Sequence, residues 1–365
     1  MTLDPTPALI VAEKPNGQRE RFSLFPSYTV PMLHDPSHSS GVSAGHRWAF
    51  LVNPVSGSGL GRHVQERLAE SLARIGLSPD RWTSDFTRPG AELIDQVAQL
   101  SQNYDRIVVA GGDGTIGLSL QGLQRGAQSA CALGVIPMGT GNDLARELRL
   151  LPEYRQGGLD SLLEAFLLDR TAPLDLWSIN GVATMVNYIS LGLDGKSTEA
   201  FANRRVLGGA HSILANKLRF AQSGILSLTH RLPADFRIRL HRGGVVQDVQ
   251  LSGRRTLAIH NISHYAAGLM RVADTRPDDG LLTVTCFPTM GTYGACLLRR
   301  LFTRGRIGGG MLPTWKADRV ECFWTGDVGL QIDGEGREDL RECGHLDIRA
   351  IARVQVLVGN PEGKP

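Results

Sequence analysis

The sequence predicts a two-domain protein, in which an α/β domain with a parallel sheet precedes a mostly antiparallel β domain. Apolar runs at Trp48–Val52, Ile107–Ala110 and Ala132–Pro137 each lead into a glycine-rich turn and then into residues with helical spacing. Repeated units of strand, turn and helix are typical of parallel α/β sheets. After about Thr171 the pattern changes to alternating, strand-like runs. The length of 365 residues also suits two domains better than one.

The first strand and helix of the α/β domain are clearly marked. The apolar residues Trp48–Val52 end at Asn53–Gly59, a segment rich in Asn, Pro, Ser and Gly that is typical of a turn. Between Val64 and Ile75, apolar residues recur at intervals of four, four and three, which is the spacing of one helical face. We therefore expect an amphipathic helix that ends at Gly76.

The second domain is marked by strand-like runs with helical patterns between them. We expect strands at Asp235–His241, Thr256–Ile262, Leu281–Phe287 and Val328–Asp333, and helices around Ser197–Ser223 and Thr292–Phe302. The predicted organisation is a poorly ordered extension at residues 1–46, the α/β domain at 47–172, the β-rich domain at 173–350 and a C-terminal strand and tail at 351–365.

The composition excludes several classes of protein. With 39 basic and 36 acidic residues, the net charge of +3 is too small to indicate a nucleic-acid-binding protein. None of the five cysteines has the spacing of metal ligands, so we expect reduced thiols in a cytoplasmic protein. No stretch approaches the roughly 18–20 apolar residues that a membrane-spanning helix needs.

The segment Gly111–Thr115 has the chemistry of a phosphate-binding loop. It reads Gly-Gly-Asp-Gly-Thr and follows the buried strand predicted at Ile107–Ala110. Glycines allow backbone N–H groups to face a polyphosphate, and a helix N-terminus adds partial positive charge. Asp113 and Thr115 could then orient a nucleotide or a metal-bound water. Taken alone, the glycine pair is more typical of a tight strand-to-helix turn.

Two further loops favour the phosphate-binding alternative. Asn53–Gly59 and Gly139–Asp143 also follow apolar strands, and the carboxyl ends of parallel strands lie at the edge of the sheet where ligands bind. The loops lack the dinucleotide-binding pattern Gly-x-Gly-x-x-Gly, and no Gly-Lys-Ser/Thr is present as in a Walker loop. The sequence therefore predicts a nucleotide site that is built from three glycine turns.

These motifs resemble the catalytic fold of diacylglycerol kinases, which is shared with sphingosine and ceramide kinases and more distantly with NAD kinases. The resemblance covers roughly Trp48–Ala350 and implies a Rossmann-like N-terminal domain, a β-sandwich second domain, and ATP as cofactor. It includes a weaker nucleotide element, Thr-x-x-Gly-Ala, at Thr87–Ala91. By resemblance, the residues that bind ATP are Asn53, Ser56, Gly57, Thr87, Gly111, Gly112, Asp113, Gly114, Thr115, Ile116, Gly117, Thr140 and Asn142.

The residues around these loops favour diacylglycerol as substrate. Many bacterial lipid kinases continue the glycine loop with Asn-Glu, whereas Gly117–Leu118 resembles the continuation in eukaryotic-type diacylglycerol kinases. Pro137–Arg146 resembles that subgroup's proline-to-arginine motif, and Asn187–Asp194 with Asn216–Leu218 resembles the accessory domain. NAD kinases, kinases of sphingoid bases or ceramide, and a nucleotide-binding module without catalysis remain alternatives.

Two acidic clusters are candidates for the metal and the general base. By resemblance, the carboxylate of Asp279 and the carbonyls of Arg276 and Leu281 would hold Mg²⁺, which prefers oxygen ligands, although an Asp-Gly turn is an equal alternative. Glu335 is the first candidate for the base and Asp333 the second, because two nearby acids raise one pKa toward neutrality.

We expect the product to be phosphatidic acid and the partner to be a lipid surface. The apolar residues of Tyr293–Phe302 and the neighbouring arginines could dock on anionic headgroups as a peripheral membrane face. A buried helix with a solvated basic edge is an equal alternative. The sequence leaves open a homodimer, the choice of lipid and the role of residues 1–46.

Overall fold

The computed structural model describes residues 9–13, 19–23, 45–126, 130–198, 230–303, 306–307 and 311–360. The chain divides into two compact units, Met1–Ser40 and Gly41–Pro365, which are described separately. In its described part, the first unit contains two antiparallel strands, β1 (Leu9–Glu13) and β2 (Arg19–Ser23). Both strands lie within residues 1–46, where the sequence led us to expect a poorly ordered extension.

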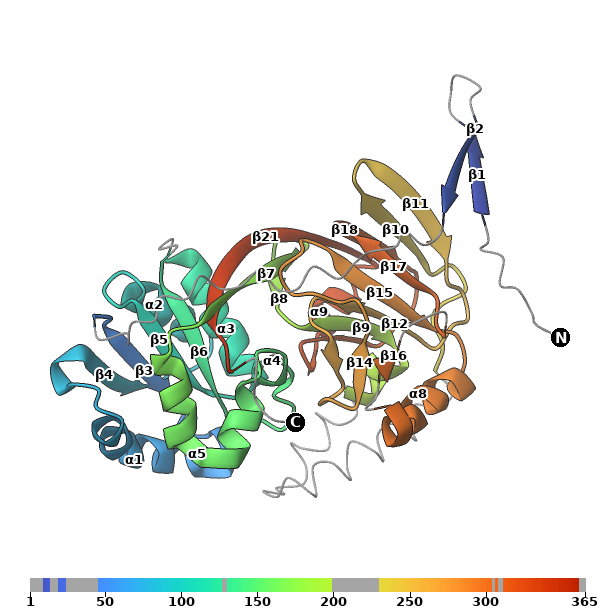
Figure 1. Cartoon of the computed structure of the whole chain (residues 1–365). Helices are drawn as coiled ribbons and strands as arrows, with labels where there is room; N and C mark the ends of the chain where they lie inside the picture. Colours follow the sequence, from blue (N-terminus) through green and yellow to red (C-terminus); the bar gives the residue numbers. More distant parts are fainter. Residues whose placement is uncertain are drawn as a thin grey trace. The chain divides into compact units, whose positions relative to one another are not determined.

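A parallel sheet with helices around it forms the first half of the second unit, called here the α/β half (Figure 1). Its strands run in the order β4-β3-β5-β6, and their bounds are β3 (Trp48–Val52), β4 (Trp82–Phe86), β5 (Arg106–Gly111) and β6 (Ala132–Pro137). The helices are η1 (Ser56–Gly59), α1 (Leu60–Arg74), η2 (Pro79–Arg81), α2 (Glu92–Leu100), α3 (Asp113–Arg125), α4 (Asp143–Glu147) and α5 (Leu150–Leu167). All residues of β3, β5 and β6 are buried. The three predicted strands are confirmed.

Helix α1 shows how the sequence sets the packing of this half. Val64, Leu68 and Leu72 form its buried stripe, as the periodicity predicts, and the helix ends at Arg74, two residues before Gly76. Gly61 lies where a Cβ would collide with the carbonyl oxygen of Asn53. A glycine is therefore required for the helix to start directly beside the loop that follows β3.

Two sheets form a sandwich in the second half, called here the β half. Within the described residues, one sheet continues as β11-β10-β18-β21 beside β7 and β8, and the other has the order β17-β15-β12-β9-β19-β20. Trp177, Leu257, Val320 and Leu330 come from both sheets and belong to one buried apolar cluster. The antiparallel β domain that the sequence predicts is thus confirmed.

The bounds of its elements are β7 (Thr171–Ile179), β8 (Ala183–Met185), β9 (Tyr188–Gly192), β10 (Arg237–Arg242), β11 (Val245–Gln250), β12 (Thr256–His260), β13 (His264–Tyr265), β14 (Met270–Val272), β15 (Leu282–Phe287), α8 (Met290–Thr303), β16 (Arg306–Ile307), β17 (Thr314–Ala317), β18 (Arg319–Phe323), β19 (Leu330–Ile332), β20 (Glu335–Gly336), α9 (Glu338–Arg341) and β21 (His345–Leu357). The helical pattern at Thr292–Phe302 corresponds to α8. Most of Ser197–Ser223, with Asn216–Leu218, lies outside the described residues. No helix in the described part of the chain is long and apolar enough to span a bilayer.

The long strand β21 joins the two halves into one sheet (Figure 1). It pairs antiparallel with β18 and β7, and its residues Gln355 and Val356 pair parallel with Ala132 and Leu133 of β6. A bulge between Ala350 and Ala352 interrupts its pairing with β7. The expected end of the second domain, residue 350, therefore lies inside a single strand that both halves share.

Candidate active site

Three glycine loops meet at the carboxyl ends of β3, β5 and β6, as the sequence predicts. They are called here the first loop (Asn53–Gly59), the second loop (Gly111–Thr115) and the third loop (Gly139–Asp143). A Cβ on Gly112 would lie 3.3 Å from the Cα of Gly139, so the second and third loops touch through backbone. The first loop reaches the second through the amide of Asn53, which donates a hydrogen bond to Thr115 Oγ1 at 2.8 Å. The loops bring N–H groups to the N-terminus of α3, where anions bind favourably.

Asp113 connects the second loop to the third by a hydrogen bond. Its carboxylate accepts a hydrogen bond from the N–H of Asn142 at 2.9 Å. Loss of hydration, together with the charge of Asp143, raises the pKa of Asp113 to about 7. The N–H donor works against this shift.

The other residues that we expected to bind ATP lie in different surroundings. Ser56, Gly112, Gly114 and Gly117 line a cavity at the loops, whereas Ile116 is buried in the apolar core. Gly57 has a φ of +61° in η1, and Gly111 ends β5 against the side chain of Thr115.

Two of the expected polar side chains have structural partners or face solvent. Asn142 hydrogen-bonds both the N–H and the carbonyl of Gly139, at 2.8 and 2.7 Å, so its side chain holds the third loop in shape. Thr140 is exposed. The N–H of Thr87 donates to the carbonyl of Val52, which places Thr87 beyond the end of β4 and beside the first loop.

The cavity at the glycine loops has a volume of about 420 Å³ and is lined by both halves of the unit. The α/β half contributes Ser56 and residues of α3 from Asp113 to Gln121. The β half contributes Thr184, Ile332, Asp333, Glu335 and Arg337. The two expected catalytic acids thus face the expected phosphate loop.

Asp333 and Glu335 differ sharply in their partners. Asp333 has a left-handed φ of +51°, and its carboxylate accepts hydrogen bonds from the N–H groups of Val186, Asn187 and Tyr188 at 2.7 to 3.0 Å. Loss of hydration raises the pKa of Asp333 to about 6 against the effect of these donors. Glu335 is exposed in β20, and its carboxylate lies where a Cβ on Gly114 would collide with it.

In the loop that we expected to bind Mg²⁺, the carboxylates of Asp278 and Asp279 are already paired with cationic side chains. Asp279 accepts a hydrogen bond from the N–H of Leu281 at 3.0 Å and lies 3.2 Å from the ammonium of Lys316. Arg276 pairs with Asp278. Among the described residues, no group of three or more His, Cys, Asp or Glu is arranged to hold a metal. A cation at Asp279 would have to displace Lys316, and this assignment stays a prediction.

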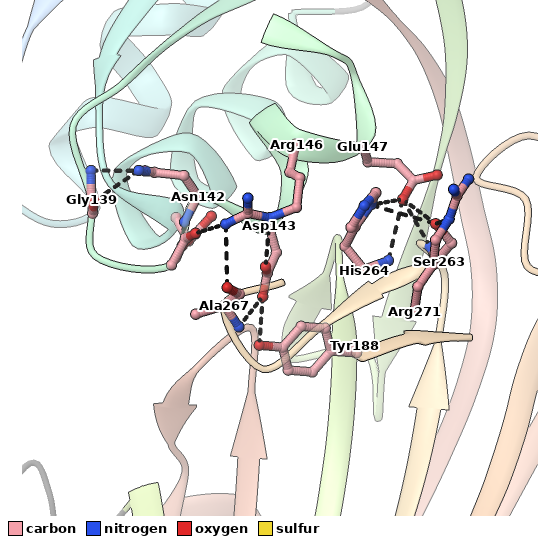
Figure 2. Close-up of polar contacts among 12 residues, drawn as sticks. Gly139, Asn142, Asp143, Arg146, Glu147, Tyr188, Ser263, His264, Ala267 and Arg271 are labelled. Atoms are coloured by element: carbon pink, nitrogen blue, oxygen red, sulfur yellow. Dashed lines mark hydrogen bonds and ion pairs between the residues drawn. The ribbon is translucent and has the colours of Figure 1, made fainter. Parts of the chain in front are cut away.

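The structure adds two residues to the site that the sequence analysis did not single out (Figure 2). Asp143 is buried, and its carboxylate accepts hydrogen bonds from Tyr188 Oη at 3.2 Å and from the N–H of Ala267 at 2.9 Å. Burial raises the pKa of Asp143. The N–H of Tyr188 also donates to Asp333. Both residues lie in segments that carry the resemblance, but nothing in their spacing shows that they touch.

Comparison with known proteins follows the same division into two halves. The diacylglycerol kinase catalytic domain matches residues 47–179, and the diacylglycerol kinase accessory domain matches residues 184–336. A Pseudomonas aeruginosa protein named "Probable lipid kinase YegS-like" is 30% identical over 278 residues, which cover 72% of this chain and 80% of that protein. The chain belongs to the diacylglycerol kinase family. It is therefore a lipid kinase that uses ATP.

Other members of the family agree in sequence and fold. A diacylglycerol kinase of Staphylococcus haemolyticus is 30% identical over 288 residues, covering 78% of this chain and 81% of that protein. A crystal structure of a diacylglycerol kinase from Bacillus anthracis superposes with a TM-score of 0.60 at 18% identity, over 86% of this chain and 97% of the other. The predicted fold class, an α/β domain with a β-sandwich, is confirmed.

Proposed function

We propose that this lipid kinase phosphorylates the hydroxyl of diacylglycerol to phosphatidic acid, with Glu335 as the general base. The name of the Staphylococcus haemolyticus relative and the Gly117–Leu118 continuation of the glycine loop support diacylglycerol as the acceptor. The observation that carries the role of Glu335 is its place: an exposed carboxylate in the cavity, directly opposite Gly114 in the first turn of α3.

The two acids of the Asp-Gly-Glu turn would have different roles, Asp333 a structural one and Glu335 a catalytic one. Asp333 is held by three N–H donors, so its carboxylate fixes the turn beside Tyr188. Glu335 faces the cavity and takes the proton of the acceptor hydroxyl as the oxygen attacks the γ-phosphorus. The bond from the γ-phosphorus to the bridging oxygen breaks, ADP leaves, and the proton passes from Glu335 to water.

The glycine loops would hold the phosphates of ATP. The N–H groups around Gly112 and Gly114 lie at the N-terminus of α3, where a polyphosphate meets partial positive charge without a side chain in the way. Asp113, Asp333 and Glu335 line the same cavity and would repel a bare polyphosphate. Mg²⁺ that enters with ATP would supply the missing positive charge.

Diacylglycerol is a membrane lipid, so we propose that the protein acts as a peripheral protein at the bilayer surface. Tyr293 packs against a buried cluster of the β half and hydrogen-bonds Asp194, so the proposed docking face is limited to the basic and apolar residues from Leu297 to Phe302. The side chains from residue 297 onward in this segment lie outside those that the structure describes. Binding of the protein to lipid surfaces and the formation of a homodimer can both be measured directly.

The test is transfer of labelled phosphate from ATP to lipids in mixed micelles. Diacylglycerol, monoacylglycerol, ceramide and a sphingoid base are presented separately, with NAD as a water-soluble acceptor. We expect the highest kcat/KM on diacylglycerol and a product that migrates with phosphatidic acid. A higher kcat/KM on ceramide or the sphingoid base would reassign the substrate, and labelling of NAD alone would refute lipid phosphorylation.

A further inference from the structure

A dense contact joins helix α4 to the β half beside the proposed active site (Figure 2). One carboxylate oxygen of Glu147, the last residue of α4, accepts four hydrogen bonds. Ser263 donates its N–H at 3.0 Å and its hydroxyl at 2.7 Å. His264 donates its N–H at 3.2 Å and contacts the same oxygen through Nδ1 at 2.7 Å. Arg271 lies behind this pair and donates to the Ser263 hydroxyl at 3.3 Å.

The charge of Glu147 is kept although its side chain is only 12% exposed. Burial by itself would raise its pKa, but the bonds from His264 and Ser263 and the nearby charge of Arg271 lower it overall. Asp143, one turn earlier on the same helix, shows the opposite shift. A buried charge is costly unless it is paired and hydrogen-bonded, and here every donor comes from one short segment of the β half.

That segment has a backbone that alanine does not favour. Ala266, Ala267 and Gly268 have φ values of +55°, +57° and +73° in succession. The left-handed region suits Gly268 but is disfavoured for the two alanines, so neighbouring contacts must hold them there. Glu147 binds Ser263 and His264, which precede Tyr265 and the two alanines, and a Cβ on Gly268 would collide with the guanidinium of Arg146.

The strained backbone is what brings Ala267 to the site. Its N–H donates to Asp143 at 2.9 Å, and its carbonyl accepts a hydrogen bond from Arg146 at 3.2 Å. On one side, Asp143 follows Asn142, and the N–H of Asn142 donates to Asp113 of the phosphate loop. On the other side, Asp143 accepts a hydrogen bond from Tyr188 Oη, and the N–H of Tyr188 donates to Asp333. The position of the segment is therefore connected to both walls of the cavity.

We propose that Glu147 is a positioning residue for phosphoryl transfer. It anchors the segment Ser263–Gly268, which ends in the left-handed residues Ala266–Gly268, to α4, so that Ala267 and Tyr188 hold Asp143 in a fixed place between the phosphate loop and the Asp-Gly-Glu turn. This role rests on the proposed function of the cavity. Glu147 itself does not line the cavity.

The experiment compares Glu147→Gln with Glu164→Gln, an exposed glutamate of α5 that gives the same change of charge. Both are assayed on whichever lipid the wild type phosphorylates best, so the outcome does not depend on the acceptor being diacylglycerol. We expect Glu147→Gln to lower kcat roughly 10–100-fold, the scale of a small misplacement of reacting groups, with little change in the KM for ATP. Glu164→Gln should match the wild type.

A second substitution separates positioning from loss of folding. Glycine adopts a left-handed backbone without penalty, so Ala267→Gly should reduce the need for the anchor. We expect Glu147→Gln combined with Ala267→Gly to recover on the order of fivefold in kcat relative to Glu147→Gln alone, the gain that relief of roughly one residue's strain allows. Should Glu147→Gln fail to fold, Ser263→Ala removes one donor to the same oxygen and should lower kcat by a smaller factor. Unchanged kcat in folded Glu147→Gln or Ser263→Ala, or no recovery in the double variant, would overturn the proposal.

Discussion

Glu335 and Asp333 lie two residues apart, but only Glu335 presents its carboxylate to the cavity without a ring of backbone donors. Replacing Glu335 by Gln keeps the size of the side chain and removes its ability to take a proton. We expect kcat to fall roughly 10²–10⁴-fold, the usual effect of losing a positioned acid–base group. The KM for ATP and the melting temperature should change little.

The matched control is Glu338→Gln, an exposed glutamate three residues further along the chain. It makes the same change of charge outside the cavity and should leave kcat at the wild-type value. Near-normal turnover of Glu335→Gln would remove the base from this position and leave the proton to Asp113 or water.

Asp333 should behave as a residue that stabilises the fold. Its carboxylate accepts hydrogen bonds from three consecutive N–H groups, of Val186, Asn187 and Tyr188. Asp333→Asn would turn an N–H₂ group toward at least one of these donors, so we expect the free energy of unfolding at pH 4 to fall by about 1–3 kcal/mol. At pH 8 the variant should regain this loss, because the wild type then bears the charge whose desolvation raises the pKa of Asp333 to about 6. Urea titration measures this loss. A variant as stable as the wild type at pH 4 but without turnover would instead transfer the chemical role to Asp333.

Residues whose chemistry is local can be predicted from the sequence, whereas residues whose contacts are distant along the chain cannot. Gly111–Thr115 could be recognised because a glycine pair after a buried strand is a local pattern. Asp143 and Tyr188 are 45 positions apart, and neither has an unusual neighbour that would predict their hydrogen bond. The separate surroundings of Asp333 and Glu335 also depend on Val186–Tyr188, which only the folded β half brings near.

At the scale of elements, the strands of the α/β half follow directly from their apolar runs. The three predicted runs correspond to β3, β5 and β6 to within one residue. The β half is less predictable, because short antiparallel strands are set by their neighbours as much as by their own residues. The run expected at Val328–Asp333, for example, is a strand only at Leu330–Ile332, where β9 pairs with it.

The loop from Arg276 to Leu281 allows a prediction about cations. Lys316 on β17 supplies positive charge to Asp279, so removing that charge should leave a carboxylate that a divalent cation can occupy. We expect Lys316→Met to have a melting temperature ~2–5 °C lower than the wild type in EDTA, and Mg²⁺ to restore part of the loss. Differential scanning calorimetry with and without Mg²⁺ measures both values.

Lys196→Met is a suitable control for this loop, because Lys196 pairs with Asp327 on a different loop of the β half. It should respond to Mg²⁺ no more than the wild type does. If Mg²⁺ raises the melting temperature of Lys316→Met no more than that of this control, the loop does not bind a cation even when Lys316 is removed. The expected metal site is then wrong.

At the scale of the whole molecule, the two halves of the second unit share a sheet and should unfold together. Strand β21 pairs with β7 and β18 in one half and with β6 in the other. This pairing could not be predicted, because residues 132–133 and 355–356 are more than two hundred positions apart and both are ordinary apolar segments. The predicted boundary at residue 350 followed the change in pattern, whereas the folded strand continues through it.

Because the halves are joined in this way, a partly buried acid in the β half should affect the stability of the whole unit. The carboxylate of Asp194 accepts a hydrogen bond from Tyr293 Oη at 2.6 Å, but loss of hydration outweighs this bond and raises the pKa of Asp194 to about 6. The unfolded value is about 3.9. The folded state therefore binds this proton more tightly than the unfolded state, and stability falls as the pH rises from about 4 to about 6.

Asp194→Asn replaces the titrating carboxyl group by an amide that stays neutral, and it keeps an oxygen that can accept the hydrogen bond from Tyr293. We expect the variant and the wild type to have similar free energies of unfolding at pH 4, where Asp194 is protonated in the folded chain and about half protonated in the unfolded chain. At pH 8 the wild type bears the cost of this poorly hydrated charge, and the variant should be more stable by about 3 kcal/mol, which corresponds to the difference between a folded pKa of about 6 and an unfolded pKa of about 3.9. Taking the difference between the two urea titrations at each pH isolates Asp194 from His260, whose pKa burial lowers to about 3 and whose effect on stability has the opposite sign. A difference that stays constant from pH 4 to pH 8 would show that Asp194 titrates alike in the folded and unfolded chains, and that hydration reaches this carboxylate in the folded protein.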